Sequence, residues 1–219
     1  MIEVNLIDKM GSDLSVVNAA RVSFANKHEE FDKNHDERLI KYLAKHNHWS
    51  PFAHCSLQFH IRAPVFVARQ MVKHQVGLSW NEVSRRYVDI EPEFYNPDTW
   101  RQRSPDKKQG SLDQQVRRSD IVEKTVENFN DMVRTIYNNL LEHEVAPEQA
   151  RMILPQSMMT EWYWSGTLYA FARVCNLRTS SDAQYETRTV AYDISKHAKD
   201  NFPISWKHLT EEVNGNSGN

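Results

Sequence analysis

Glycine is scarce in this sequence, with six residues among 219, at positions 11, 77, 110, 166, 215 and 218. No two of them fit the patterns G-x-G-x-x-G or G-x-x-x-x-G-K-[ST], which form the two common glycine-rich phosphate-binding loops. The sequence therefore argues against a Rossmann dinucleotide site and against a P-loop. If the chain binds a nucleotide, side chains must supply more of the contacts to its anionic groups.

Other absences exclude further classes. The two cysteines, Cys55 and Cys175, are too few for a disulfide framework or a zinc site. No apolar run approaches the roughly 20 residues that a membrane helix needs, and the start of the chain is too short and too charged for a secretory signal. The net charge of −2 gives no global positive field for nucleic acid. We therefore expect a cytoplasmic protein with reduced cysteines and without metal, membrane or nucleic-acid partners.

The order of the predicted elements favours an α+β fold. The length fits a single domain over residues 1–213, followed by a disordered tail at 214–219. Strands and helices do not alternate as βαβ units, so we expect a central, mostly antiparallel or mixed sheet flanked by helices, and not a Rossmann fold. Strands are predicted at 2–8, 55–61 and 158–165, and residues 88–111 are predicted to form a loop. Helices are predicted at 13–24, 37–46, 64–75, 113–144, 167–176 and 182–200, with a short one between Pro147 and Pro155.

The helix predicted at 113–144 carries a sustained apolar stripe. Its members recur with alternating spacings of four and three residues and are Val122, Val126, Phe129, Val133, Ile136 and Leu140. Such a stripe is typical of packing in a core or against another subunit.

A basic and polar segment over 62–87 is the most informative part of the chain. Its formal charge is +4, although the whole chain is slightly acidic. The basic residues are followed within a short span by Ser79, Asn81, Glu82, Ser84 and Arg86. This set suits a ligand that is anionic at one end and has amide-like edges at the other. A solvated basic surface with helix caps has the same composition.

A second polar cluster extends over 151–188. Its members are Arg151, Arg173, Asn176, Arg178, Ser180, Ser181, Asp182, Gln184, Glu186 and Arg188. Arg178 comes at a predicted helix end, directly before the capping sequence Thr179-Ser-Ser-Asp182. Its guanidinium is placed either to point into a cleft between helices or to interact with the dipole of its own helix.

These clusters resemble the flavin-dependent thymidylate synthase family, whose signature is R-H-R-x-x-S-x-N-E-x-S-x-R-Y. The stretch Ser79–Tyr87 matches the second half fully. The first half reads Lys73-His74-Gln75, with lysine and glutamine in place of the two arginines and one extra residue before Ser79. Supporting matches occur at 18–24, 48–54, 66–70, 93–95, 150–155 and 176–178, so the resemblance covers most of the chain.

The resemblance implies an enzyme that makes dTMP from dUMP. Methylenetetrahydrofolate would supply the carbon, FAD the hydride, and NADPH the reducing equivalents for the flavin, in a homotetramer with shared active sites. The residues implied to contact FAD are Ser50, Lys73, His74, Gln75, Glu82, Thr167, Tyr169 and Arg173. Those implied to hold dUMP are Gln70, Lys73, Glu82, Ser84, Arg85, Arg86, Arg151 and Arg178. Arg178 would be the catalytic residue that activates the uracil ring.

The residues present agree with that chemistry. A guanidinium near the uracil can stabilise the enolate-like charge needed at C5, while the flavin supplies the hydride. The flavin-free class of thymidylate synthase needs a cysteine nucleophile, but Cys55 and Cys175 lie outside the polar clusters and are predicted core residues. Ser84 has no adjacent base, so we expect it to bind rather than attack.

Two other classes of function are compatible with parts of the sequence. A single-stranded nucleic-acid binder could use the segment 62–87 with Trp80, Tyr87 and Tyr95 as stacking platforms, although the acids Asp89, Glu91 and Glu93 interrupt a long phosphate track. A metal-dependent phosphohydrolase could use those acids with His46, His48, His54 and His60.

Overall fold

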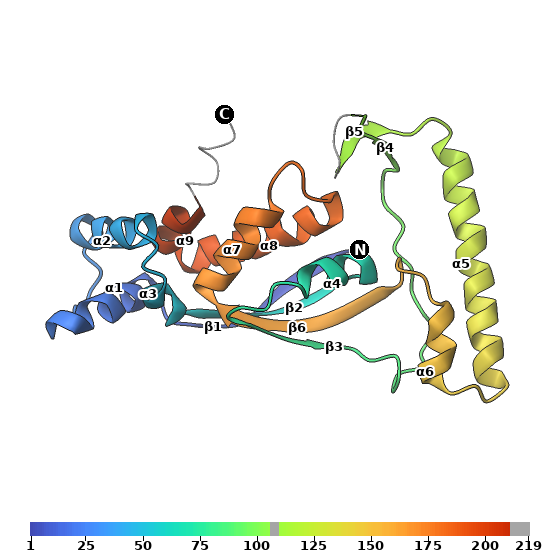
Figure 1. The fold of residues 1–219 in the computed structure, drawn as a ribbon, viewed down its shortest axis with the longest axis horizontal. Coiled ribbons are helices and arrows are strands. Elements are labelled where there is room, and N and C mark those ends of the chain that lie inside the picture. Colours follow the sequence, from blue (N-terminus) through green and yellow to red (C-terminus); the bar gives the residue numbers. More distant parts are fainter. Residues whose placement is uncertain (106–109, 211–219) are drawn as a thin grey trace.

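The fold is built on a four-stranded antiparallel sheet with helices packed on one face (Figure 1). A computed structural model describes residues 1–105 and 110–210 of the chain. The strand order is β1-β2-β6-β3, and all three ladders are antiparallel. A separate hairpin pairs β4 with β5. The strands are β1 Glu3–Met10, β2 Ser56–Pro64, β3 Leu78–Glu82, β4 Arg101–Arg103, β5 Ser111–Gln115 and β6 Met159–Thr167. The expected α+β class with an antiparallel sheet, and not a Rossmann fold, is confirmed.

The helices fall into three groups. In Figure 1, α4, α7 and α8 lie over one face of the sheet, α1, α2, α3 and α9 gather at one end, and α5 lies with α6 at the other end. Their bounds are α1 Asp13–Arg21, α2 Lys33–Lys45, α3 Ser50–Ala53, α4 Val65–Met71, α5 Ser119–Glu142, α6 Pro147–Ala150, α7 Leu168–Arg178, α8 Tyr185–Asn201 and α9 Pro203–Thr210. Two short 3-10 helices cover Val22–Phe24 and Arg151–Ile153.

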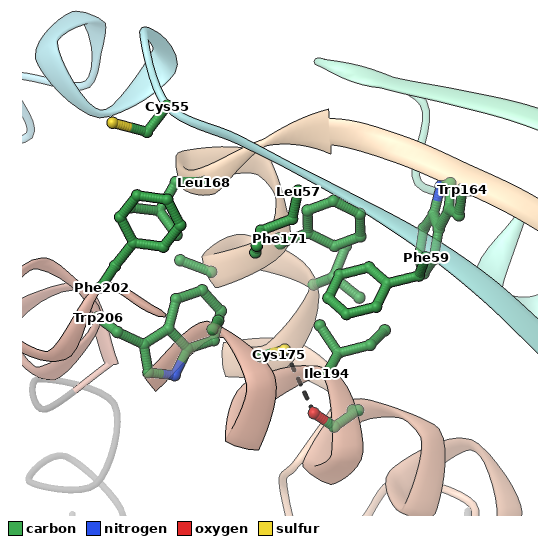
Figure 2. Packing of buried hydrophobic residues seen from close by; sticks show 14 of the residues in the cluster. Cys55, Leu57, Phe59, Trp164, Leu168, Phe171, Cys175, Ile194, Phe202 and Trp206 are labelled. Atoms are coloured by element: carbon green, nitrogen blue, oxygen red, sulfur yellow. Dashed lines mark hydrogen bonds between the residues drawn. The ribbon is translucent and has the colours of Figure 1, made fainter. Parts of the chain in front are cut away.

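The hydrophobic core lies between the sheet and the helices above it (Figure 2). Alternate residues of β2 are buried, including Leu57, Phe59 and Ile61, because side chains of a strand point to opposite faces in turn. The ring of Phe59 meets the ring of Phe171 edge-on, with centroids 5.1 Å apart. Cys55 and Cys175 are free and buried in this core, so the prediction that they are core residues is confirmed.

The two ends of the described chain are joined by hydrogen bonds. The carboxylate of Asp13, in the first turn of α1, accepts the backbone N–H groups of Ile204 and Ser205 at 3.0 and 2.9 Å. These donors start α9 and have no partner within that helix, so the carboxylate caps it. His197 of α8 lies 3.2 Å from the carbonyl oxygen of Val4 in β1. The C-terminal helices are thus fixed to the first strand and the first helix.

Several predicted boundaries differ from the structure. The helix predicted over 64–75 ends at Met71, and Gly77, with φ of +77°, leads into β3, which sequence patterns did not predict. The helix predicted over 113–144 begins only at Ser119, because its first predicted residues belong to β5, which pairs with β4. Strand β4 lies inside the stretch 88–111 that was predicted to be a loop. The helix α9 was also not predicted. The end of the predicted domain and the predicted tail at 214–219 lie outside the described residues.

Helix α5 is only partly covered within the subunit. Its buried residues include Val133 and Tyr137, whereas Phe129 and Ile136 of the predicted stripe are 44% and 42% exposed. Part of the apolar stripe is therefore left uncovered by the rest of this subunit. Within residues 1–105 and 110–210, no helix is long and apolar enough to cross a membrane.

Candidate functional site

A cavity of about 620 Å³ brings together residues from both polar clusters. Its walls come from α4, the end of α7, the start of α8 and the β4–β5 hairpin. Gln70 and Arg178 of the predicted site both line it, although they are far apart in the sequence. The volume is in the range of pockets that hold small-molecule ligands.

Arg178 is held at the cavity by His74. The Nε of Arg178 donates a hydrogen bond of 3.0 Å to Nε2 of His74. Burial, followed by the charges of Arg178 and Arg173, lowers the pKa of His74 from its usual 6.5. The imidazole is therefore neutral at pH 7 and serves as the acceptor. The Nη groups of Arg178 make no hydrogen bond to any residue that the structure describes, and they remain available to a ligand.

Unneutralised positive charge surrounds this pair. Lys73 and Arg173 are exposed, and neither makes an ion pair or hydrogen bond with the residues at 1–105 and 110–210. Arg173 is close enough to His74 to affect its pKa. Gln75 is exposed beside them. This group of donors is suited to an anionic ligand such as a phosphate or diphosphate.

The cavity is also lined by residues that sequence reasoning did not assign to the site. Arg101 of β4 forms an ion pair with Glu186 of α8, donates 2.9 Å to Oγ of Ser111 and lies 4.1 Å over the ring of Tyr185. Tyr95 also lines the cavity, and burial raises the pKa of its hydroxyl to about 12. Gln184 and Glu186 belong to the polar cluster at 151–188, but nothing in the pattern linked them to Arg101.

None of the predicted FAD residues lines this cavity. His74 reaches it through its hydrogen bond to Arg178, whereas Thr167, Tyr169, Glu82 and Ser50 have other surroundings. Thr167 caps α7, its Oγ1 accepting the N–H of Ala170 at 3.1 Å, and Tyr169 is half-buried against the core. Glu82, at the end of β3, accepts 2.8 Å from Thr160 and 3.2 Å from the indole of Trp80. Ser50 lines a separate hollow with His48 and Trp49. Their roles toward FAD stay predictions.

Of the eight predicted dUMP residues, Gln70 and Arg178 line the cavity and six do not; two of the six, Lys73 and Glu82, are described above. Ser84 and Arg86 follow β3, and the Oγ of Ser84 accepts the N–H and Nε of Arg86 at 3.3 Å each. Arg85 is buried and donates to the carbonyl oxygen of Ile90. Arg151 is exposed and donates 3.2 Å to the carbonyl oxygen of Glu148. In Figure 1 the chain after β3 runs toward α6, beside which Arg151 begins its 3-10 helix.

The structure also shows where the residues suggested for a nucleic-acid binder and for a metal-dependent phosphohydrolase lie. Trp80, a suggested stacking platform, is packed against Trp162 with ring centroids 4.5 Å apart and against Trp164, so its ring is engaged within the protein. Among the residues at 1–105 and 110–210, no three His, Cys, Asp or Glu side chains come together as metal ligands. The ring of Trp80 is thus packed inside the protein, whereas that of Tyr87 is exposed.

Comparison with known sequences gives consistent matches. A family model described as "Thymidylate synthase complementing protein" matches residues 5–204. The chain is similar to the flavin-dependent thymidylate synthase of Thermosipho africanus, with 40% identity over 211 residues that cover 93% of this chain and 89% of that protein. It is 36% identical to the flavin-dependent thymidylate synthase of Thermus thermophilus over 214 residues, covering 96% and 76% of the two chains.

A solved structure has the same fold. The UMP/dUMP methylase PolB from Streptomyces cacaoi, bound with 5-Br dUMP, superposes with a TM-score of 0.86 and 31% sequence identity. The match covers 96% of this chain and 95% of that one. The same methylase with 5-Br UMP gives a TM-score of 0.85 at 30% identity. The likeness therefore extends over nearly the whole of both chains.

Proposed function

The chain belongs to the flavin-dependent thymidylate synthase family, and from this premise we propose that it makes dTMP from dUMP by reductive methylation. The one-carbon unit comes from methylenetetrahydrofolate and the hydride from FAD, which NADPH reduces. The observation on which this proposal depends is that Gln70 and Arg178 line the same cavity, where the Nε of Arg178 donates a hydrogen bond to the neutral His74. The solved relatives, bound with 5-Br dUMP and 5-Br UMP, support a pyrimidine nucleotide as substrate.

The residues around His74 fit an anionic flavin nucleotide. Lys73 and Arg173 present positive charge without a carboxylate partner in the part of the chain that the structure describes, as the diphosphate of FAD requires. Lys73 and Gln75 replace the two arginines of the family signature, so this chain relies on a point charge where a bidentate fork would otherwise bind. When bound, FAD supplies the hydride that completes the methyl group.

Arg178 activates the uracil ring in this proposal. For C5 to attack the one-carbon unit, negative charge must develop on the ring carbonyls and N3, and the Nη groups of Arg178 are free to donate to it. A preorganised donor of this kind contributes roughly 3–4 kcal/mol to transition-state stabilisation. The C5 proton is then lost, and a hydride converts the attached methylene group to methyl.

A cysteine nucleophile has no place in this mechanism. Burial raises the pKa of the Cys55 thiol to about 11, and it raises the pKa of Cys175 as well. Neither thiol lines the cavity, and a buried thiol with a raised pKa is a poor nucleophile. Activation by charge rather than by covalent attack is the chemistry that these side chains support.

The scattered dUMP residues support a site shared between subunits. Ser84, Arg86 and Arg151 do not line the cavity of their own subunit, although each carries donors suited to a phosphate. In the homotetramer that we propose, they complete the cavity of a neighbouring subunit. The exposed apolar stripe of α5 is a surface suited to such an assembly. The cytoplasmic location and the lack of nucleic-acid partners stay predictions.

The proposed function is tested by the absorbance of the purified protein and by product analysis. We expect a flavin spectrum in the blue that is released on denaturation, and dTMP formed from dUMP only when methylenetetrahydrofolate and NADPH are present. A colourless protein that cannot be reconstituted with FAD would overturn the proposal. Oligonucleotide binding with a steep salt dependence, without dTMP formation, would instead favour a nucleic-acid binder.

A further inference from the structure

A chain of side-chain contacts connects the β4–β5 hairpin to Gln70. Gln70 donates through Nε2 to Oε1 of Gln184. Gln184 in turn donates through its Nε2 to Oε2 of Glu186 at 3.3 Å. The other carboxylate oxygen of Glu186 pairs with Arg101. These four residues all line the cavity that contains Arg178.

The chemistry of these groups determines which way each amide points. A carboxylate only accepts hydrogen bonds, so Gln184 must turn its NH₂ group toward Glu186. Its oxygen then faces Gln70, and Gln70 must turn its own NH₂ group toward Gln184. The amide oxygen of Gln70 is thereby left over, and it receives no hydrogen bond from the residues at 1–105 and 110–210.

The carboxylate of Glu186, at one end of this series of hydrogen bonds, is held in a fixed position. Its side chain is 6% exposed and that of Arg101 is 14% exposed, so both charges are largely withdrawn from water. Arg101 is fixed in turn by Ser111 at 2.9 Å and by the ring of Tyr185 at 4.1 Å. A buried carboxylate bonded to a guanidinium keeps its oxygens in one place, and the orientation of both amides follows from that.

We propose that Glu186 and Gln184 are positioning residues that make Gln70 a hydrogen-bond acceptor in the cavity and thereby select uracil over cytosine. The inference rests on the proposed function, because it takes a pyrimidine nucleotide as the occupant. Uracil offers an N3–H donor flanked by two carbonyl acceptors, which matches an amide oxygen that shares a cavity with the guanidinium of Arg178. Cytosine offers an acceptor at N3, which would face the amide oxygen of Gln70 without a proton between them.

The test compares the binding of dUMP and dCMP to the whole 219-residue chain by titration calorimetry. We expect the wild-type protein to prefer dUMP. In Glu186→Gln an amide replaces the carboxylate, and this amide can donate as well as accept hydrogen bonds. The orientation of the Gln184 and Gln70 amides is then no longer imposed. The ratio of the two dissociation constants should then fall about tenfold, the scale of one hydrogen bond to a buried polar group.

Two further variants separate orientation from folding. Gln184→Leu removes the middle link and keeps the pair of Glu186 with Arg101, so it should lose the same discrimination even if Glu186→Gln fails to fold. Thr210→Ala removes a hydrogen bond to the carbonyl oxygen of Trp206 within α9, at a residue that does not line the cavity, and should leave the ratio unchanged. A variant that merely loosens the cavity weakens both nucleotides equally and leaves their ratio as it was.

The outcomes distinguish the two proposals. If the wild-type protein binds neither nucleotide, the proposed function fails. If it binds dUMP but shows no preference over dCMP, or if the preference survives in both Glu186→Gln and Gln184→Leu, the positioning role is overturned while the proposed function stands.

Discussion

Arg178 and His74 form the contact on which the proposed chemistry depends. A guanidinium bonded through Nε to a neutral imidazole keeps its charge and loses rotational freedom. Its remaining donors are then fixed before a substrate arrives, which is the condition under which a donor stabilises a transition state.

Replacing Arg178 separates catalysis from flavin binding. We expect Arg178→Ala to reduce the rate of dTMP formation by at least about 10²–10³-fold, the loss seen for a single transition-state donor. Flavin absorbance should remain, because Lys73, His74 and Arg173 are unchanged. Steady-state kinetics and a visible spectrum of the same preparation measure both effects. Normal turnover by the variant would remove Arg178 from its activating role.

His74 makes stability depend on pH in a predictable direction. The pKa of His74 is lowered from 6.5 in the folded protein. As the pH falls below 6.5, the unfolded chain therefore takes up a proton at this residue before the folded protein does. The contribution of this residue is therefore complete above about pH 6.5 and is lost as the pH falls toward the lowered value. His74→Gln keeps an acceptor that cannot be protonated. Urea unfolding at about pH 7.5 and about pH 5.5 should show a smaller loss in the variant; an equal loss would contradict this account.

The limits of sequence reasoning are clear at the scale of single residues. Gln70 and Arg178 were assigned to one ligand and do share a cavity. Arg101 was missed, because its partner Glu186 is far away in the sequence and no periodicity links them. Arg85 was assigned to dUMP from the resemblance to the family signature, yet its guanidinium lies against the carbonyl oxygen of Ile90 in its own loop.

At the scale of elements, the β3–β6 ladder depends on a close approach of two backbones. Gly166 of β6 pairs with Leu78 of β3. A Cβ at position 166 would contact the Leu78 side chain and lie 2.5 Å from the carbonyl oxygen of Gly77. Only glycine therefore leaves room for the turn that starts β3.

We expect Gly166→Ala to destabilise the protein by about 1–3 kcal/mol, as overpacking does in tight sites. The clash involves a backbone oxygen, which cannot rotate away as a side chain would. Ser79→Ala, at an exposed position of the same strand β3, is the matched control and should change stability little. Urea unfolding measures both. Equal stability of the two variants would show that β3 can move away from β6 at this point, and it would contradict the requirement for glycine.

Prediction succeeded for β2, which has one buried face, and failed for the sparsely packed β3 and β4–β5 hairpin and also for the buried helix α9. The alternating pattern at 55–61 identified β2, because a strand with one buried face must alternate. Strand β3 lies at the edge of the sheet, and three of its five residues are exposed, so its sequence carries little alternation. The hairpin of β4 and β5 is held by Arg101 and Ser111 rather than by an apolar face, and it gave no periodic signal.

At the scale of the whole molecule, the active site that we propose exceeds one subunit. Gln70 and Arg178 lie on one cavity, whereas Arg86 and Arg151 lie elsewhere on the same chain. A sequence motif states which residues belong together but not which copy of the chain supplies them, so the separation became visible only in the structure.

Co-expression of two inactive variants tests this arrangement. Arg178→Ala and Arg86→Ala should each be inactive alone, because each removes one part of every site. In mixed assemblies, about a quarter of the sites would receive both intact residues if subunits combine at random, and dTMP formation should return to that extent. Arg178→Ala with Gln70→Ala is the control: these residues share a cavity within one subunit, so no mixture restores a site. Absence of recovery in the first pair would contradict a shared site.

The capping of α9 by Asp13 has a consequence for how the chain acquires its structure during synthesis. The carboxylate of Asp13 is 191 and 192 residues away in the sequence from the amides of Ile204 and Ser205 that it binds, so all of that stretch must be synthesised before the cap can form. Strand β2 likewise waits for β6 as its neighbour. Helix α1 and strand β2 therefore lack some of their partners until α9 and β6 have been translated. Contacts so distant in sequence are typical of slow folding, and nascent chains of this protein should depend on protection from aggregation until α9 is released.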